Sequence, residues 1–214
     1  MQDLGRVCQN RGFSQLINHG ICTDILNDAP DADAAFFDMP MGDRSGLESD
    51  DVTRPDRYST VSEVNNGEVR IRRHVLKQYS YPLEEWIDKW PAQPSQYSGS
   101  SHSFRREKMA KYATEARRLV SELVEAITES LGLGLSRGDL RTQMERGFEM
   151  MAVNCYPPPG TSSDLPTRVS IASLPSLAVD ERFEVAKQLV DVRHAGMYRG
   201  SSLKEFVEFL PAGG

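Results

Sequence analysis

The sequence has few cysteines, no long apolar run and no excess of positive charge. Cys8, Cys22 and Cys155 are odd in number and far apart, which indicates reduced thiols, and no CxxC pair supports a structural zinc site. No apolar stretch approaches the roughly 20 residues of a membrane span, and the first residues do not resemble a secretory signal. The net charge of -6 argues against binding to nucleic acid. Together these absences predict a soluble, cytoplasmic protein with neither a membrane nor a nucleic acid as partner.

The strongest periodic signal in the sequence lies between Phe104 and Leu131. Apolar residues recur there every three or four positions, and charged residues occupy the other face. Gly132 follows at the place where a helix-terminating glycine belongs. The pattern predicts one long amphipathic helix.

Shorter signals predict the remaining elements. Alternating polarity indicates strands, and Ser or Asp followed by an acidic residue indicates a helix start. The dense basic stretch Arg70–His74 is interpreted as a solvated strand or helix face. In chain order, the other predicted elements are a break at Gly12, a strand at 13–17, a helix through Phe37 that Pro30 kinks or shortens, loop over most of 40–67, a short helix capped at Ser136–Asp139, strands at 148–156 and 167–172, a helix at 181–190 capped by Asp180, and a last helix through Leu210 opened by a Ser202–Glu205 capping box.

Two segments carry polar side chains at a spacing that suits a carboxylate. Arg168 and Ser170 lie two residues apart on a predicted strand, so both side chains leave the same face. A guanidinium holds a carboxylate through two parallel hydrogen bonds, and a hydroxyl adds a third, so this pair is a candidate clamp for one end of a small dicarboxylate. Asn154 and Tyr156 share a face in the same way. On spacing alone, the alternative is an exposed arginine and serine that bind nothing.

Five segments, taken in order, resemble one enzyme family over most of the chain. They are Arg11–Ile21, Ala35–Pro40, Asn154–Pro158, Thr167–Ala172 and Tyr198–Ser202. Together they resemble the plant iron(II)/2-oxoglutarate-dependent dioxygenases. Within that group the chain looks most similar to the flavanone 3-dioxygenase-like enzymes and the downy-mildew-resistance salicylate hydroxylases.

The resemblance implies an α+β fold, in which a helical N-terminal lobe with a long central helix precedes a double-stranded β-helix, or jelly roll. It also implies Fe(II), 2-oxoglutarate and ascorbate as cofactors, and a flavonoid- or phenolic-type plant metabolite as the small molecule that is hydroxylated or desaturated. In the family, the Arg and Ser of an RxS motif and the Tyr of an NxY motif hold 2-oxoglutarate. The resemblance gives this role to Arg168, Ser170 and Tyr156, with Asn154 nearby.

The family's iron ligands, an HxD pair and a distant histidine, have no counterpart in this sequence. A facial triad needs two imidazoles and a carboxylate that converge on one side of the metal. In the family these ligands lie between NxY and RxS, but here only residues 157–167 separate Tyr156 from Arg168, and they contain no histidine. We therefore expect an incomplete β-helix without its central strands and without the family's first strand. The expected site has no catalytic and no metal-binding residue.

The four histidines offer no replacement for the missing ligands. His19, His74, His102 and His194 each lack an aspartate two positions later. His19 matches the family's structural Asn-His-Gly turn, and the other three are interpreted as exposed. Cys155 is interpreted as a small strand residue, because no base adjoins it in the sequence.

The predicted organisation has three segments. These are an N-terminal dioxygenase-type lobe at 1–100, the long helix with a short connecting helix at 101–147, and a truncated β-helix region with C-terminal helices at 148–214. A barrel without its middle leaves sheet edges unpaired, so we expect a marginally stable or aggregation-prone chain.

Three hypotheses about function stay open. The chain is an inactive enzyme by descent, a non-catalytic protein that pairs with a full-length homologue or retains carboxylate binding, or a truncated isoform, pseudogene product or gene-model fragment without activity.

Overall fold

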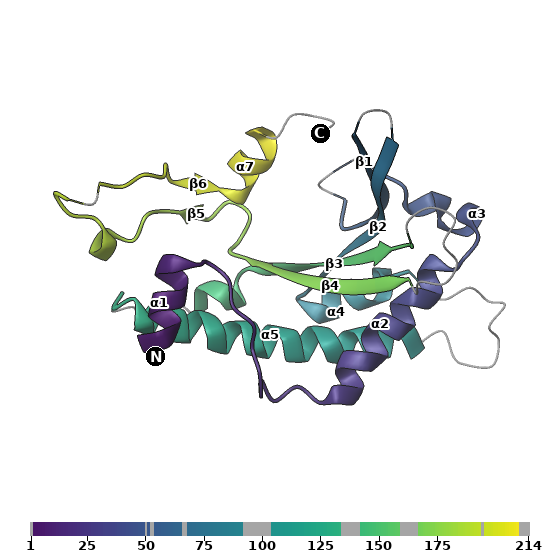
Figure 1. Ribbon diagram of the computed structural model, residues 1–214, viewed down its shortest axis with the longest axis horizontal. Helices are drawn as coiled ribbons and strands as arrows, with labels where there is room; N and C mark the ends of the chain where they lie inside the picture. The colour runs from purple at the N-terminus through teal and green to yellow at the C-terminus, as the bar shows by residue number, and fades with distance from the viewer. Residues whose placement is uncertain are drawn as a thin grey trace. The chain divides into compact units, whose positions relative to one another are not determined.

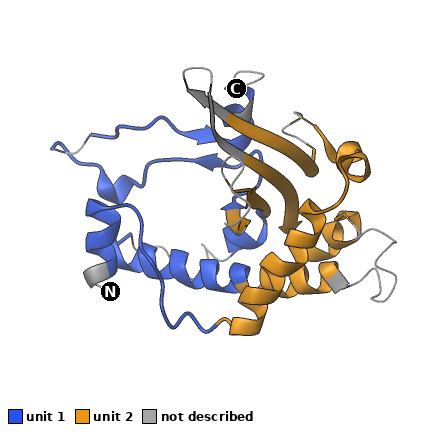
Figure 2. Cartoon of the chain, turned by 45° about the vertical axis from the view of Figure 1, so that its right-hand side comes forward, with its two compact units in different colours: residues 1–20, 116–148, 175–214 blue, residues 21–115, 149–174 orange. Residues whose placement is uncertain are grey.

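The computed structural model describes residues 2–49, 51, 54–65, 68–91, 104–133, 142–158, 167–193 and 195–209. The chain divides into two compact units, each assembled from separate stretches of sequence (Figure 2). Unit 1 comprises residues 1–20, 116–148 and 175–214, and unit 2 comprises residues 21–115 and 149–174. In the described part of the chain, no helix combines the length and apolar character that crossing a bilayer requires.

Unit 2 is built on a four-stranded sheet with the strand order β1-β2-β3-β4 (Figure 1). Tyr58 of β1 pairs with Leu76 of β2, which in turn pairs with Val153 of β3, and both pairings are antiparallel. The combination of helices with a sheet that does not close confirms the predicted α+β class. The strands β3 and β4 confirm the two strands predicted in the second half of the chain. The bounds are β1 Asp56–Asn65, β2 Glu68–Tyr81, β3 Phe148–Tyr156 and β4 Arg168–Ser176.

One face of this sheet packs against helices, because its inward positions are apolar. The core contains Phe36 and Phe37 from α2, Met109 from α5 and the fully buried ring of Trp90. From the sheet it receives Tyr58, Leu76, Met151, Val153 and Cys155. The helices that belong to unit 2 are α2 Thr23–Phe37, α3 Met41–Arg44, α4 Leu83–Trp86 and the first part of α5 Phe104–Ser130, with 3-10 turns at Ser45–Leu47 and Ile87–Lys89.

The predicted long helix is confirmed as α5, and its end follows the predicted chemistry. Gly132 has φ +66, the left-handed region that glycine adopts without strain. Its N–H donates to the carbonyl of Glu129, and the N–H of Leu133 donates to Thr128. These two bonds form a Schellman motif, which satisfies carbonyls that the last turn would otherwise leave unpaired.

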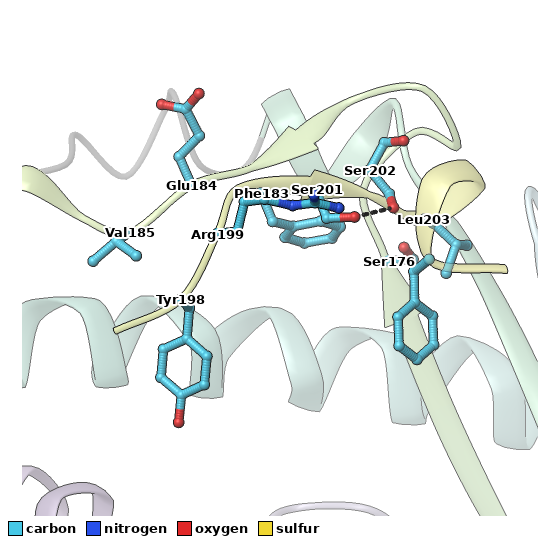
Figure 3. Close-up of a pocket in the computed structure, with 10 residues that line it drawn as sticks. Ser176, Phe183, Glu184, Val185, Tyr198, Arg199, Ser201, Ser202 and Leu203 are labelled. Atoms are coloured by element: carbon cyan, nitrogen blue, oxygen red, sulfur yellow. Dashed lines mark hydrogen bonds between the residues drawn. The ribbon is translucent and has the colours of Figure 1, made fainter. Parts of the chain in front are cut away.

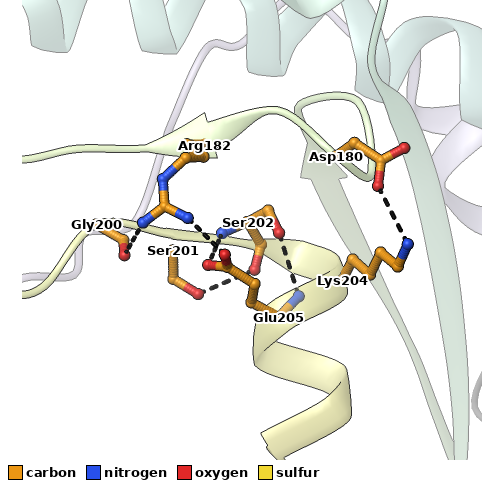
Figure 4. Close-up of polar contacts among 7 residues, drawn as sticks. All are labelled: Asp180, Arg182, Gly200, Ser201, Ser202, Lys204 and Glu205. Atoms are coloured by element: carbon orange, nitrogen blue, oxygen red, sulfur yellow. Dashed lines mark hydrogen bonds and ion pairs between the residues drawn. The ribbon is translucent and has the colours of Figure 1, made fainter.

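Unit 1 contains α1 Gln2–Asn10, the second part of α5 and a short hairpin that leads into the last helix. The hairpin strands are β5 Arg182–Phe183 and β6 Ser201–Ser202, a 3-10 turn covers Lys187–Leu189, and the last helix is α7 Leu203–Phe209. The predicted capping box of α7 is confirmed (Figure 4), because Ser202 Oγ accepts from the Glu205 N–H and a Glu205 oxygen accepts from the Ser202 N–H, both at 3.1 Å. Glu205 also pairs with Arg182 at 2.5 Å.

Two predicted elements were wrong. Residues 13–17 form no strand, and Phe13 and Ile17 are 76% and 78% exposed, because no described strand lies beside them to accept their hydrogen bonds. Residues 181–190 form no helix, because Arg182 and Phe183 pair with Ser202 and Ser201 instead. The predicted helix through Phe37 is confirmed as α2, and Pro30 does not shorten it.

Residues 40–67 are not mostly loop, since they contain α3 and the whole of β1. The Gly12 break is confirmed by its φ of +71. The predicted cap at Ser136–Asp139 lies outside the described residues. The three predicted segments stay a prediction, because the two units group residues by contact and not by contiguous stretches of chain.

Candidate functional site

The predicted site residues lie on the sheet face that points away from the helices. Val153 and Cys155 of β3, together with Val169 of β4, pack in or against the core, so the alternate residues of both strands point to the other side. Below, this side is called the second sheet face. Its polar residues include Arg57 of β1, Arg73 and Lys77 of β2, Asn154 and Tyr156 of β3, and Arg168 and Ser170 of β4.

The structure brings Arg168, Ser170 and Tyr156 together across two hydrogen-bonded strands. The guanidinium carbon of the exposed Arg168 lies 4.1 Å from the centroid of the half-buried Tyr156 ring. Ser170 acts on the Tyr156 phenol from the same face and lowers its pKa. Because β3 and β4 are neighbours in the sheet, the strand period alone places these groups on one face.

Arg73 is a member of this cluster that sequence reasoning missed. Its side chain acts on the Tyr156 phenol from β2, on the opposite side from β4, and lowers the pKa of the phenol. The interpretation of Arg70–His74 as a solvated face gives Arg73 no role at the site, and the signal that identifies it is strand alternation. Since Leu76 faces the core, Arg73 must face the other way.

The ionisation of Tyr156 reflects these cationic neighbours. Burial raises the pKa of the phenol, but hydrogen bonds from Arg73 and Ser170 and the positive charges of Arg73 and Arg168 outweigh it. The pKa of Tyr156 therefore lies below the ordinary tyrosine value. Donors and cations that stabilise a phenolate also suit a carboxylate, because both present anionic oxygen.

Asn154 lies on the same face as Tyr156, but its side chain is buried and bonds to its own strand. The residue is buried, and its amide donates to the Ala152 carbonyl at 3.1 Å. Asn154 thus lies beside the Arg168 cluster, but its side-chain amide is already hydrogen-bonded to the backbone of β3.

The residues that the structure describes do not fit the family's iron. His74 is half-buried and not exposed as predicted, because Nδ1 lies 2.7 Å from the Tyr58 hydroxyl and 3.0 Å from Thr60 Oγ1. His19 is half-buried as well, and His102 and His194 lie outside the described residues. Across the described ranges, no three side chains of His, Cys, Asp or Glu converge where they could hold a metal ion. Cys155 is buried, which raises the pKa of its thiol, as suits a packed strand residue.

A pocket of about 520 Å³ lies within unit 1 (Figure 3), and no sequence-predicted cofactor residue lines it. Three aromatic rings dominate its wall, and Arg199 supplies a cation. The sequence marked this region only through the segment Tyr198–Ser202. The lining residues are Ser176, Phe183, Glu184, Val185, Tyr198, Arg199, Ser201, Ser202, Leu203 and Phe206.

Comparison with known proteins decides the family. The chain is 30% identical to 2-oxoglutarate-dependent dioxygenase 21, chloroplastic, of Oryza sativa subsp. japonica, over 99% of this chain and 81% of that protein. This chain belongs to the plant iron(II)/2-oxoglutarate-dependent dioxygenases. Residues 1–93 of this family member match the family described as non-haem dioxygenase in morphine synthesis N-terminal.

A second relative shows how short this family member is. It is 37% identical to flavanone 3-dioxygenase 3 of Oryza sativa subsp. japonica over 73% of this chain, but the match spans only 44% of that protein. The match to dioxygenase 21 extends over 283 aligned positions, more than the 214 residues present here. That relative therefore has residues within the matched region that this chain lacks. Their loss between Tyr156 and Arg168 stays a prediction from the motif order.

A solved structure confirms the fold. The crystal structure of JOX2 in complex with 2OG, Fe and JA aligns with a TM-score of 0.75 at 17% identity, over 98% of this chain and 80% of that one. The family member thus has the oxygenase fold, with sheets that do not close into the barrel.

Proposed function

We propose that this family member binds 2-oxoglutarate through Arg168, Ser170 and Tyr156, beside Asn154, and does not carry out the family's iron-dependent oxidation. The contact between Arg168 and the Tyr156 ring carries the proposal, since it sets a guanidinium next to a phenol that Arg73 and Ser170 already polarise. Two cations and a hydroxyl around one point form a donor set for a carboxylate. When bound, iron would supply the oxidation, but the ligands that hold it in the family are missing from the sequence.

The proposal separates two parts of one family site. The crystal structure of JOX2 holds 2OG and Fe together. In this chain the residues that match the RxS and NxY motifs remain, while no HxD occurs among its 214 residues. A flavonoid- or phenolic-type substrate is proposed for the intact ancestor, since one relative is named a flavanone 3-dioxygenase. A requirement for ascorbate stays a prediction from the family resemblance, and a cytoplasmic location stays a prediction from the absences in the sequence. Pairing with a full-length homologue stays one of the three hypotheses about function.

Arg168→Ala is expected to weaken binding of 2-oxoglutarate by about tenfold or more, because charge-assisted hydrogen bonds contribute roughly 1.5–3 kcal/mol. Isothermal titration calorimetry on the purified full chain measures this. Arg168 is exposed, so its removal leaves the fold intact. Arg11→Ala removes another exposed arginine and serves as the control, with unchanged affinity expected. Equal affinity of Arg168→Ala and the unmodified chain would overturn the proposed site.

Iron is expected to add nothing to this binding. Anaerobic titration with Fe(II) in the presence of 2-oxoglutarate should produce no metal-to-ligand charge-transfer absorbance, because the described residues offer no facial set of two imidazoles and a carboxylate, and the sequence contains no HxD. A full-length relative that retains the HxD motif and the distant histidine is the positive control. Appearance of the band in this chain would restore the hypothesis of an active enzyme.

A further inference from the structure

The second sheet face gathers four cations in a chain whose net charge is -6. Besides Arg168 and Arg73, it carries Lys77 of β2 and Arg57 of β1, which pair directly across the two strands. Arg57 is buried and anchored, since its guanidinium donates to the Arg54 carbonyl at 3.1 Å. Lys77 is half-buried, and among the described residues no carboxylate forms an ion pair with it, with Arg73 or with Arg168.

The surroundings of Lys77 disfavour the charged form of its side chain. Burial lowers the pKa of its ammonium, and the like charges of Arg57 and Arg73 lower it further. Burial also lowers the pKa of Arg57, although the nearby Tyr79 and Asp51 raise it. Cations that are crowded together and partly withdrawn from water are costly, and a bound anion removes that cost. An anion beside Lys77 would therefore be stabilised.

The strand register shows how the cations are spaced. Arg73 and Lys77 are four residues apart on β2, which places their Cα atoms about 13 Å apart at roughly 3.3 Å per residue. On the neighbouring strand, Lys77 stands opposite the small side chain of Ala152, and Val75 stands opposite Asn154. Arg73 lies near the Tyr156 phenol, whose pKa it lowers, and Arg168 stacks on the Tyr156 ring. The cationic groups thus run in one series from Arg168 through Arg73 toward Lys77.

We propose that Lys77, next along the sheet from Arg73, forms a second anion subsite, so that the sheet face binds both ends of a small dicarboxylate without a metal ion. One carboxylate binds at Arg168 and Ser170, as in the proposed function on which this inference rests, and the other binds at Lys77. Because no metal chelates a 2-oxo group, the site recognises two carboxylates and not the ketone. Glutarate, which has the chain length of 2-oxoglutarate without its ketone, should bind about as tightly.

The test compares glutarate with pentanoate, which has the same chain length and one carboxylate fewer. By calorimetry, glutarate is expected to bind the unmodified chain at least tenfold more tightly than pentanoate. Lys77→Met keeps the length of the aliphatic stem and removes the charge. It should lower glutarate affinity about tenfold and leave pentanoate affinity unchanged. Lys111→Met, at an exposed lysine of α5, is the matched control and should change neither affinity.

The outcomes separate the two proposals. If both ligands bind equally and Lys77→Met changes neither, the second subsite is wrong while the site at Arg168 stands. If neither ligand nor 2-oxoglutarate binds, the proposed function fails as well. Circular dichroism of Lys77→Met shows whether the variant is folded, and a misfolded variant is replaced by Lys77→Gln. A preference for 2-oxoglutarate over glutarate by more than tenfold would also overturn the inference, since it requires recognition of the ketone.

Discussion

Replacing Asp33 by alanine is expected to lower the free energy of unfolding by about 3–5 kcal/mol, enough to unfold a marginal protein. Asp33 of α2 and Arg105 of α5 form an ion pair inside unit 2, and both side chains are almost completely buried. The same guanidinium group donates to the side-chain oxygen of Gln78 at 3.3 Å. Removing Asp33 leaves a buried cation without its counter-ion, which is far more costly than losing the pair as a whole.

Urea denaturation followed by tryptophan fluorescence measures the unfolding of unit 2, which contains the ion pair. Both tryptophans of the chain, Trp86 and Trp90, lie in unit 2, and the Trp90 ring is part of the core. Lys108→Ala is the control, since it breaks the solvent-accessible pair with Asp28 and should cost less than 1 kcal/mol. An Asp33→Ala variant whose free energy of unfolding matches that of Lys108→Ala would show that the pair contributes nothing.

Gly147→Ala is expected to destabilise unit 1 by at least about 1–3 kcal/mol. A Cβ atom at this position would lie 2.1 Å from the backbone carbonyl oxygen of Ser176 and 3.1 Å from that of Met144. Backbone atoms cannot rotate away as a side chain can, so the two segments must separate. Thermal unfolding followed by circular dichroism should show a lower midpoint.

Gly42→Ala is the matched control for this second prediction. Gly42 lies in α3, and an added Cβ atom would meet nothing within 4 Å. The substitution should leave stability unchanged or raise it by roughly 0.5–1 kcal/mol, because alanine favours the helix. If the Gly147→Ala and Gly42→Ala variants have the same midpoint of thermal unfolding, the close approach of Gly147 to Ser176 is not a constraint on the fold.

Local patterns in the sequence predicted the elements that local chemistry determines. The helix α5 follows from a long apolar stripe with its glycine terminus, and α7 follows from the reciprocal Ser202–Glu205 cap. The strand β3 follows from alternation, which also placed Asn154 and Tyr156 on one face. In the two helices the interacting groups are within a few residues of one another, whereas β3 was predicted from alternation alone and pairs with the distant β2.

The elements that were missed depend on distant partners. The strands β1 and β2 are rich in arginine, serine and threonine, and their strand structure comes from a ten-residue antiparallel pairing rather than from an apolar pattern. Without β2, alternation could not be applied to Arg73 or Lys77, so half of the candidate site stayed hidden. In the same way, the sequence pattern predicted a helix at Arg182 and Phe183, because their strand partners lie almost twenty residues further along the chain.

Each of the two units is made of separate stretches of the chain, and this limits how the protein can be divided into fragments. The chain passes from one unit to the other near residues 20, 115, 148 and 174, and one of these crossings lies inside α5. Cutting α5 there would create two new helix ends, each with unpaired backbone groups and no cap. Neither unit can therefore be excised as one contiguous fragment with its own complete secondary structure. Limited proteolysis would release no autonomous half, and the smallest meaningful object for biophysical study is the whole polypeptide.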